Sequence, residues 1–166
     1  MVRIAEPRDA TVVAELLHDF NVEFDTPTPG AEVLARRLDA LLRSGDTIAL
    51  LAGAPATGVA LVTLRSNVWY DGPVALLDEL YVRPDLRGGG IGTALLERAC
   101  AIVRDREGQL FEINVDEVDA DARRFYERHG FVNEPVAGAG RMLYYERELR
   151  ADGADESGPA GRSVAP

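Results

Sequence analysis

The stretch Leu77-Asp-Glu-Leu-Tyr-Val-Arg-Pro-Asp-Leu-Arg-Gly-Gly-Gly-Ile-Gly-Thr93 decides the fold. Leu80 to Val82 have the apolar, aromatic and β-branched character of a buried strand, and Pro84 ends it because proline cannot donate to a ladder. Glycines follow at positions 88, 89, 90 and 92. From Thr93 onward the apolar residues recur with a helical period, at Leu95, Leu96, Ala99, Ile102 and Val103. The stretch therefore predicts a strand, a glycine-rich loop and a helix in direct succession.

The start of the predicted helix is suited to bind an anion. Its first N–H groups have no partner within the helix and point at the glycine loop, which favours a phosphate or a diphosphate. A Walker loop requires Gly-Lys-Ser/Thr, whereas this chain has Gly-Ile-Gly-Thr. A dinucleotide fingerprint requires glycine where Thr93 stands. The alternative is a plain helix cap, but so many glycines are costly in chain entropy without a ligand.

The pattern Arg87-x-x-Gly90-x-Gly92, preceded by Val82-Arg83-Pro84, resembles the acyl-CoA loop of the GNAT superfamily of N-acyltransferases. In that family the loop amides bind the cofactor diphosphate, and the preceding strand bonds the pantetheine arm. The resemblance implies acetyl-CoA as the cofactor of this chain. The cofactor contacts that it implies are Leu80, Tyr81 and Val82 in the strand, and Arg87, Gly88, Gly89, Gly90, Ile91, Gly92 and Thr93 in the loop and helix start.

A second block, Asp119-Ala-Asp-Ala-Arg-Arg-Phe-Tyr-Glu-Arg-His-Gly-Phe131, resembles the distal N-x-x-A-x-x-F-Y-x-x-x-G-F motif of the same family. The resemblance implies that Asp119 and Phe125 contact the cofactor and that Tyr126 is the acid that protonates the leaving thiolate. Aspartate stands where the family usually has asparagine. It caps a helix equally well, but an ionised carboxylate cannot donate a hydrogen bond to a ligand.

Periodicity and turn residues predict the remaining elements. Strands are expected at 3–5, 47–52, 58–64, 74–82, 110–115, 131–136 and 141–149, and helices at 7–24 and 32–44, from Thr93 onward, and within the distal block. The order β-α-α-β-β-β-α-β-α-β-β predicts an α+β domain with a mixed, mostly antiparallel central sheet. This is also the element order of GNAT proteins, which the chain resembles from residue 2 to 149.

Composition limits the domain organisation and the partners. A chain of 166 residues, 46% hydrophobic, buries one good core, so we expect one domain over residues 1–150 and a disordered tail over 151–166. A net charge of −10 without a basic stripe argues against nucleic acid. The apolar runs are strand-sized, which argues against a membrane span, and the start lacks a signal-peptide core. The single cysteine, Cys100, fits a reducing cytoplasm.

Acyl transfer to an amine requires a proton acceptor, because an alkyl ammonium has a pKa near ~10.4. Asp78 and Glu79 are the candidates, since carboxylates inside so apolar a strand need a reason. Successive strand residues face opposite sides, so only one of the two is expected to face the acceptor, and we favour Glu79, unless a bulge changes the alternation. Backbone N–H groups near Leu80 or Tyr81 are expected to stabilise the oxyanion.

The acceptor is expected to be a small-molecule amine with positive charge. The segments that frame the acceptor pocket in GNAT proteins carry aromatic rings and carboxylates, which suit a cation, although core and loop packing explains the same rings equally well. The residues expected to bind it are Phe20, Glu23, Phe24, Trp69 and Tyr70. The chain also has features similar to aminoglycoside 3-N-acetyltransferases and polyamine acetyltransferases.

Other functions remain open at the level of sequence. The acceptor can be a protein lysine or N-terminus, since one fold serves all these substrates, and a non-catalytic acyl-CoA-binding module would keep the loop without the carboxylates. His18, His129 and Cys100 have no partner that suggests catalysis, and no cluster has metal-ligand spacing. The predicted strand 141–149 is a possible edge for a homodimer.

Overall fold

The structure is a computed structural model that describes residues 1–134, 136–138, 140–145 and 147. It divides into two compact units, Met1–Ile113 and Asn114–Pro166. The predicted tail 151–166 lies outside the described residues. Within the described part, no helix is both long enough and apolar enough to span a bilayer.

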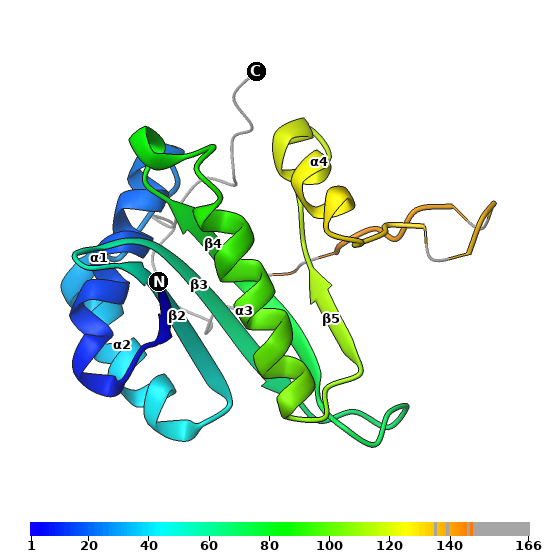
Figure 1. Cartoon of the computed structure of the whole chain (residues 1–166), viewed down its shortest axis with the longest axis horizontal. Coiled ribbons are helices and arrows are strands. Elements are labelled where there is room, and N and C mark those ends of the chain that lie inside the picture. The colour runs from blue at the N-terminus through cyan, green and yellow to red at the C-terminus, as the bar shows by residue number, and fades with distance from the viewer. Residues whose placement is uncertain (135, 139, 146, 148–166) are drawn as a thin grey trace. The chain divides into compact units, whose positions relative to one another are not determined.

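The first unit is built on one five-stranded sheet with the strands in chain order (Figure 1). The strands are β1 (Val2–Ile4), β2 (Thr47–Gly53), β3 (Ala56–Arg65), β4 (Val74–Val82) and β5 (Leu110–Ile113). The first four pair antiparallel, and β5 runs parallel to β4. The mixed, mostly antiparallel α+β sheet predicted from the element order is confirmed.

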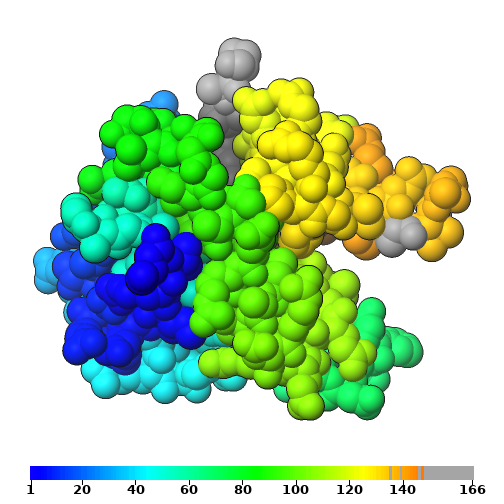
Figure 2. All heavy atoms as spheres, in the orientation of Figure 1, coloured from blue at the N-terminus to red at the C-terminus, as the bar shows by residue number. Residues whose placement is uncertain are grey.

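Helices cover both faces of this sheet because each carries one apolar side. A short 3-10 helix η1 (Pro7–Asp9) leads into α1 (Ala10–Glu23), and α2 (Ala31–Ser44) follows, ending at Gly45 with a φ of 86°. These two helices form one core with Ala49, Leu51, Val59 and Tyr81. The other face is covered by α3 (Ile91–Asp105), which buries the five apolar residues of its predicted period and lies in green across the first unit in Figure 2.

Strand β4 continues beyond its parallel neighbour. Pairing with β5 covers Val74 to Leu77, opposite Leu110 to Ile113. Pairing with β3 continues on the other edge as far as Val82. The last five residues of β4, which include the predicted proton acceptors and pantetheine contacts, therefore extend past the end of β5 and lead toward the glycine loop.

The second unit contains helix α4 (Ala120–Arg128). Asp119 caps this helix, since its Oδ1 accepts a hydrogen bond from the Ala122 N–H at 2.9 Å. Helix geometry confirms the predicted role of aspartate as a cap. The chain turns after α4 at Gly130, whose φ is 86°.

The strands predicted at 131–136 and 141–149 are not present in the described residues of those ranges, 131–134, 136, 141–145 and 147. The prediction rested on apolar and β-branched composition, but a strand also needs a neighbour for its backbone and side chains. The Met142 N–H bonds Asn133 O at 3.1 Å without a ladder, and Val132, Met142, Leu143 and Tyr145 are exposed. Residues 135, 146, 148 and 149 lie outside the described part, and the homodimer edge expected there stays a prediction.

The turn before α1 supplies a testable contribution to stability. Asp9 accepts hydrogen bonds from both terminal nitrogens of Arg3, at 2.6 and 2.8 Å, and from the Glu6 N–H at 2.8 Å. The Arg3 hydrogen bond is the main reason that the pKa of Asp9 falls to about 2. The charged form is therefore favoured in the folded state.

We expect Asp9→Asn to lower the free energy of unfolding by about 1 kcal/mol at neutral pH. Because the folded-state pKa is depressed, this stabilisation is complete above the unfolded pKa of ~3.9 and is lost as the pH falls toward 2. Urea unfolding between pH 2 and 7 measures it. Asp39→Asn, which breaks the similar but more exposed pair with Arg43, is the control and is expected to change little. A wild-type advantage over Asp9→Asn that persists undiminished at pH 2 contradicts this account.

Candidate active site

The glycine loop follows β4 through a tight turn. A 3-10 helix η2 (Pro84–Leu86) turns the chain after Arg83, and α3 begins at Ile91, two residues earlier than the predicted Thr93 (Figure 1). Gly88 and Gly90 have φ values of 78° and 82°, a left-handed conformation that glycine adopts without strain. A Cβ added at either position would meet no atom within 4 Å. The loop therefore leaves open space directly before the helix N-terminus.

This loop fits the diphosphate of coenzyme A. The peptide N–H groups from Gly88 to Thr93 belong to the loop or to the first turn of α3, where a helix cannot satisfy its own donors. The α-helix dipole adds a partial positive charge at the same place. Residues 85–90 are exposed, so a ligand has access to these donors.

Arg87 does not direct its guanidinium into the open space of the loop. Its Nε donates to Val82 O at 2.9 Å, and its two terminal nitrogens lie 2.7 and 2.8 Å from the carboxylate oxygens of Glu23 in α1. The guanidinium also lies 5.7 Å from the centre of the Tyr81 ring. Arg87, expected in the cofactor set, and Glu23, expected in the acceptor set, thus form one ion pair that ties the loop to α1 and β4.

The buried ring of Tyr81 packs at the end of β4, next to the Arg87–Glu23 ion pair. Its side chain is only 4% exposed and stacks on Phe20 with ring centres 5.2 Å apart. Burial is the main cause that raises the pKa of Tyr81, followed by the nearby charge of Glu23. Phe24 meets Phe20 edge to face at 5.3 Å. Since the ring of Tyr81 is almost fully buried, the backbone is the part of this residue that we expect to contact a cofactor.

A β-bulge changes the expected alternation of the two carboxylates. Leu61 pairs with Glu79, and the next residue Val62 pairs with Leu77, so Asp78 is an extra residue in β4. Glu79 therefore shares the face of Leu61, which packs against the α1–α2 core. Asp78 reaches the same face, since its Oδ2 accepts a hydrogen bond from the Thr63 hydroxyl at 2.6 Å. The alternation predicted for a regular strand does not apply here, because the bulge named as its exception is present and places these consecutive side chains together.

The environment of Asp78 favours its neutral form. Burial of the carboxylate by its surroundings raises the pKa of Asp78 above the ordinary value, although the residue as a whole is exposed. The hydrogen bond from Thr63 acts in the opposite direction, because it stabilises the charged form. The result is an accessible carboxylate that is more basic than an ordinary aspartate. Sequence reasoning missed Thr63, since nothing in its own segment signals a partner 15 residues away.

The residues expected to bind the acceptor do not form one group. Phe20, Glu23 and Phe24 lie near Tyr81, at the end of β4, whereas Trp69 and Tyr70 lie in the turn before Val74, at its beginning. Val74 and Tyr81 are seven residues apart along the strand, which corresponds to about 23 Å. Asn67 Oδ1 holds the turn by accepting the N–H groups of Trp69 and Tyr70, both at 2.8 Å. Trp69 is 86% exposed there.

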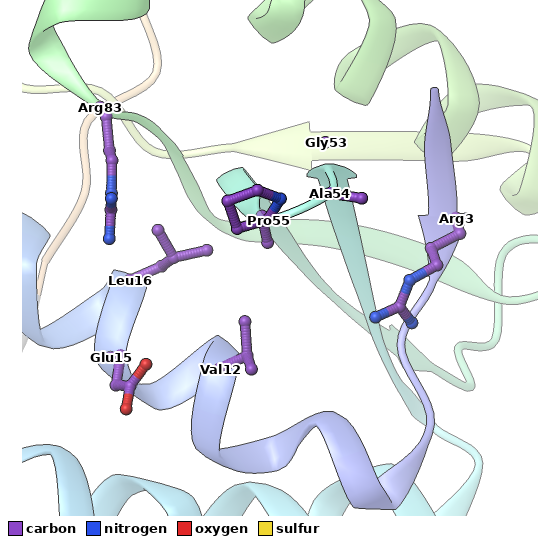
Figure 3. Close-up of a pocket in the computed structure, with 9 residues that line it drawn as sticks. Arg3, Val12, Glu15, Leu16, Gly53, Ala54, Pro55 and Arg83 are labelled. Carbon is purple, nitrogen blue, oxygen red and sulfur yellow. The ribbon is translucent and has the colours of Figure 1, made fainter.

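Two hollows lie along α1. One, of about 380 Å³, lies between α1 and the turn that joins β2 to β3, and Figure 3 shows Arg3 and Arg83 pointing toward it from opposite sides. It contains none of the expected site residues. The other, of about 350 Å³, adjoins the Arg87–Glu23 pair. It is lined by Asp19, Val22, Glu23, Tyr81, Arg83, Pro84 and Asp85. Asp19, Arg83 and Asp85 were not expected there, and Arg83 lies 3.7 Å from the Asp19 carboxylate.

In the second unit, the rings of the distal block form one cluster. The ring centres of Phe125 and Tyr126 are 5.1 Å apart, and those of Tyr126 and Phe131 are 5.8 Å apart. His129 lies against Phe125, and its Nδ1 is 2.7 Å from Phe125 O. The cluster fixes the orientation of Tyr126 on α4.

Two other kinds of chemistry receive little support. Burial is the largest cause that raises the pKa of the Cys100 thiol, which keeps it protonated and a poor nucleophile. Among the described residues, no three His, Cys, Asp or Glu side chains lie close enough to hold a metal ion.

The model of the acetyltransferase (GNAT) family matches residues 12–131 of the chain. The chain belongs to this family. A solved structure of a protein from Arthrobacter sp. FB24, assigned to the acetyltransferases, is 58% identical with a TM-score of 0.85 and covers 90% of this chain and 96% of that one. An uncharacterized N-acetyltransferase of Archaeoglobus fulgidus is 30% identical over 59% of this chain and 67% of the relative.

A further relative, an uncharacterized N-acetyltransferase of Methanocaldococcus jannaschii, is 40% identical over 38% of this chain. The match spans 28% of that relative, which is much longer than the matched segment. The resemblance to GNAT proteins inferred from the two motifs is thus confirmed, and both motifs lie within the matched residues of this GNAT chain.

The first prediction for the site concerns Arg87. We expect Arg87→Lys to raise the dissociation constant for coenzyme A about fivefold or more, because lysine keeps the charge but cannot make the three bonds to Val82 and Glu23 that hold the loop. Arg43→Lys is the control, since Arg43 makes a similar two-bond pair with Asp39 on α2, away from the loop. Titration calorimetry measures both. Wild-type affinity in Arg87→Lys would show that only the charge matters.

The second prediction concerns Gly90. We expect Gly90→Asp to weaken coenzyme A binding by about tenfold or more, because a carboxylate in the open space repels a diphosphate. Gly45→Asp is a matched control, since Gly45 also has a positive φ, of 86°, and open space around it. Both variants carry the same backbone strain, so equal loss of affinity in the two would refute a specific role of the loop.

Proposed function

We propose that this chain transfers an acetyl group from acetyl-CoA to a primary amine of a small cationic molecule. The observation that carries the proposal is the extension of β4 past β5 into a glycine loop that opens directly onto the N-terminus of α3. The uncovered edge of β4 leads directly to the amides of the loop. This order suits a long ligand that has amide groups at one end and a diphosphate at the other.

The donor is recognised mainly by the backbone. On the edge of β4 that β5 does not cover, main-chain groups of Leu80, Tyr81 and Val82 that β3 does not occupy are proposed to bond the amides of the pantetheine arm as an added strand would, and Val82 O also accepts from Arg87 Nε. The N–H groups of Gly88 to Thr93 bind the diphosphate. The buried ring of Tyr81 and the Arg87–Glu23 ion pair hold these two segments at a fixed distance.

The acceptor binds on the α1–α2 face of β4. Asp78 and Glu79 lie together on that face because of the bulge. Two adjacent carboxylates, in a chain with a net charge of −10, attract an ammonium group and disfavour anionic acceptors. A small polyamine-like or aminoglycoside-like cation fits this charge better than a neutral amine.

The reaction follows from these positions. A carboxylate of the Asp78–Glu79 pair removes a proton from the ammonium group, and the neutral amine attacks the thioester carbonyl. Backbone N–H groups of β4 stabilise the negative charge that develops on the carbonyl oxygen. By its place in the family motif, and not by its position relative to the carboxylates, the Tyr126 hydroxyl is the proposed proton donor to the leaving thiolate, whose unperturbed pKa is about 8.5.

Release of free thiol from acetyl-CoA, measured with polyamines, aminoglycosides and peptides as acceptors, tests the proposal. We expect turnover with the small cations. Turnover with peptides alone would reassign the acceptor to proteins. Coenzyme A binding without turnover on any amine would indicate a non-catalytic binding module and would contradict the proposed enzyme.

We expect Tyr126→Phe to lower kcat about tenfold or more and to leave the affinity for coenzyme A within about twofold, because only the proton donor is lost. Tyr144→Phe, at an exposed tyrosine of the same unit, is the control. Steady-state kinetics and calorimetry measure the two effects. An unchanged kcat in Tyr126→Phe would remove this residue from the mechanism.

A further inference from the structure

We propose that Thr63 is a positioning residue that holds Asp78 in place as the carboxylate that takes the proton from the acceptor amine. The inference rests on the proposed function and makes it more specific, because it selects Asp78 over Glu79. It also assigns a role to a residue of β3 that lies outside both family motifs.

The geometry starts with the bulge. As the extra residue of β4, Asp78 has no direct partner in the β3 register, where Leu61 faces Glu79 and Val62 faces Leu77. The Thr63 hydroxyl supplies the missing connection with a hydrogen bond of 2.6 Å to Oδ2 of Asp78. A short bond of this kind to a carboxylate is charge-assisted and stronger than a neutral one. It fixes the Asp78 side chain in one orientation on the acceptor side.

Thr63 and Asp78 differ in exposure in the way that a positioning residue and a proton acceptor require. Thr63 is half-buried in β3, so its hydroxyl has a fixed position, whereas Asp78 is exposed and accessible to an amine. Burial of the carboxylate raises the pKa of Asp78, and the Thr63 bond lowers it. The raised pKa makes Asp78 a better base, and the Thr63 bond opposes part of this shift by stabilising the charged form.

The proton balance is simple. The Asp78 carboxylate takes one proton from the ammonium group, and the lone pair so released forms the C–N bond to the acetyl carbon. The C–S bond breaks, and the electron pair leaves with the sulfur as a thiolate. The nitrogen still carries one proton more than the amide product and releases it to solvent, while the thiolate takes up one proton to become the thiol. The proton on Asp78 also passes to solvent, which restores the carboxylate, so one proton is released per turnover.

Other ionisable groups belong to β4 and to the elements packed around this face. They are Glu79 of β4, the ion pair of Arg65 in β3 with Glu112 in β5, and, on α1, Glu23 bound to Arg87 and His18 beside the Thr28 hydroxyl. The causes identified for the shifted pKa of Asp78 are burial and hydrogen bonds, without a contribution from these charges.

The test compares Thr63→Val, which removes the hydroxyl, with Thr63→Ser, which keeps it. Carbon-13 NMR titration of the full chain follows the Asp78 carboxyl, identified by its loss in Asp78→Asn, and the pH profile of kcat/KM follows the reaction. We expect Thr63→Val to raise the pKa of Asp78 and to move the acidic limb of the profile in the same direction. At pH 6 kcat/KM falls about threefold or more, while at pH 9 it stays within about twofold.

Thr63→Ser is expected to restore both readouts. Thr47→Val is the matched control, because Thr47 lies opposite Thr63 on β2, a strand that does not pair with β4, and we expect it to leave the Asp78 titration unchanged. If Thr63→Val moves the Asp78 titration but not the acidic limb, or if the limb follows Glu79→Gln instead, Asp78 is not the proton acceptor. If the Asp78 titration itself does not move, Thr63 does not position it. A wild-type chain that acetylates no amine is a different failure, that of the proposed function.

Discussion

The first turn of α3 carries peptide N–H groups that no carbonyl of the helix can bond, and the rest of the site depends on how they are presented. Glycines in a left-handed conformation at 88 and 90 keep the space before the helix clear of side chains. A residue with a Cβ would be strained there and would narrow the approach of a ligand. The donors are useful only if the loop keeps its shape, and the neighbouring contacts supply that rigidity.

Arg87 provides much of this support. Its guanidinium joins the end of β4 to α1 through Val82 and Glu23, and the stacked rings of Phe20 and Tyr81 fill the space beneath. Arg87 therefore supports the loop through bonds to β4 and α1, and its guanidinium does not point into the open space before the helix. In the proposed binding mode, the helix dipole and the loop amides attract the diphosphate, while the arginine fixes the geometry of the loop.

The bulge in β4 organises the other half of the site. By adding Asp78 to the strand, it turns two consecutive carboxylates toward one face without disturbing the pairing on either side of it. The Thr63 hydrogen bond then distinguishes the two carboxylates, because only Asp78 is held by it among the contacts described. In a regular strand, one of the two carboxylates would point to the opposite, apolar face of the sheet, which α3 covers.

Local patterns in the sequence were sufficient for most of the fold. The limits of β4 at Val74 and Val82 and the end of α2 at Gly45 follow from alternation, period and glycine at a helix end, and these predictions are confirmed. Contacts between distant segments were not predictable. Thr63 of β3 bonds Asp78 of the neighbouring strand β4, and Glu23 bonds Arg87, which is 64 residues further along the chain. The bulge broke the rule of alternation, and the strands expected after residue 131 had composition but no described partner.

The amide resonances of the loop give the most direct measurement of the central claim, that main-chain donors before α3 bind the diphosphate of coenzyme A. In a nitrogen-15 NMR titration with coenzyme A, the account predicts that the largest shifts occur at Gly88, Gly90 and Gly92. Binding that leaves these amides unmoved, or shifts only residues remote from the loop, contradicts it.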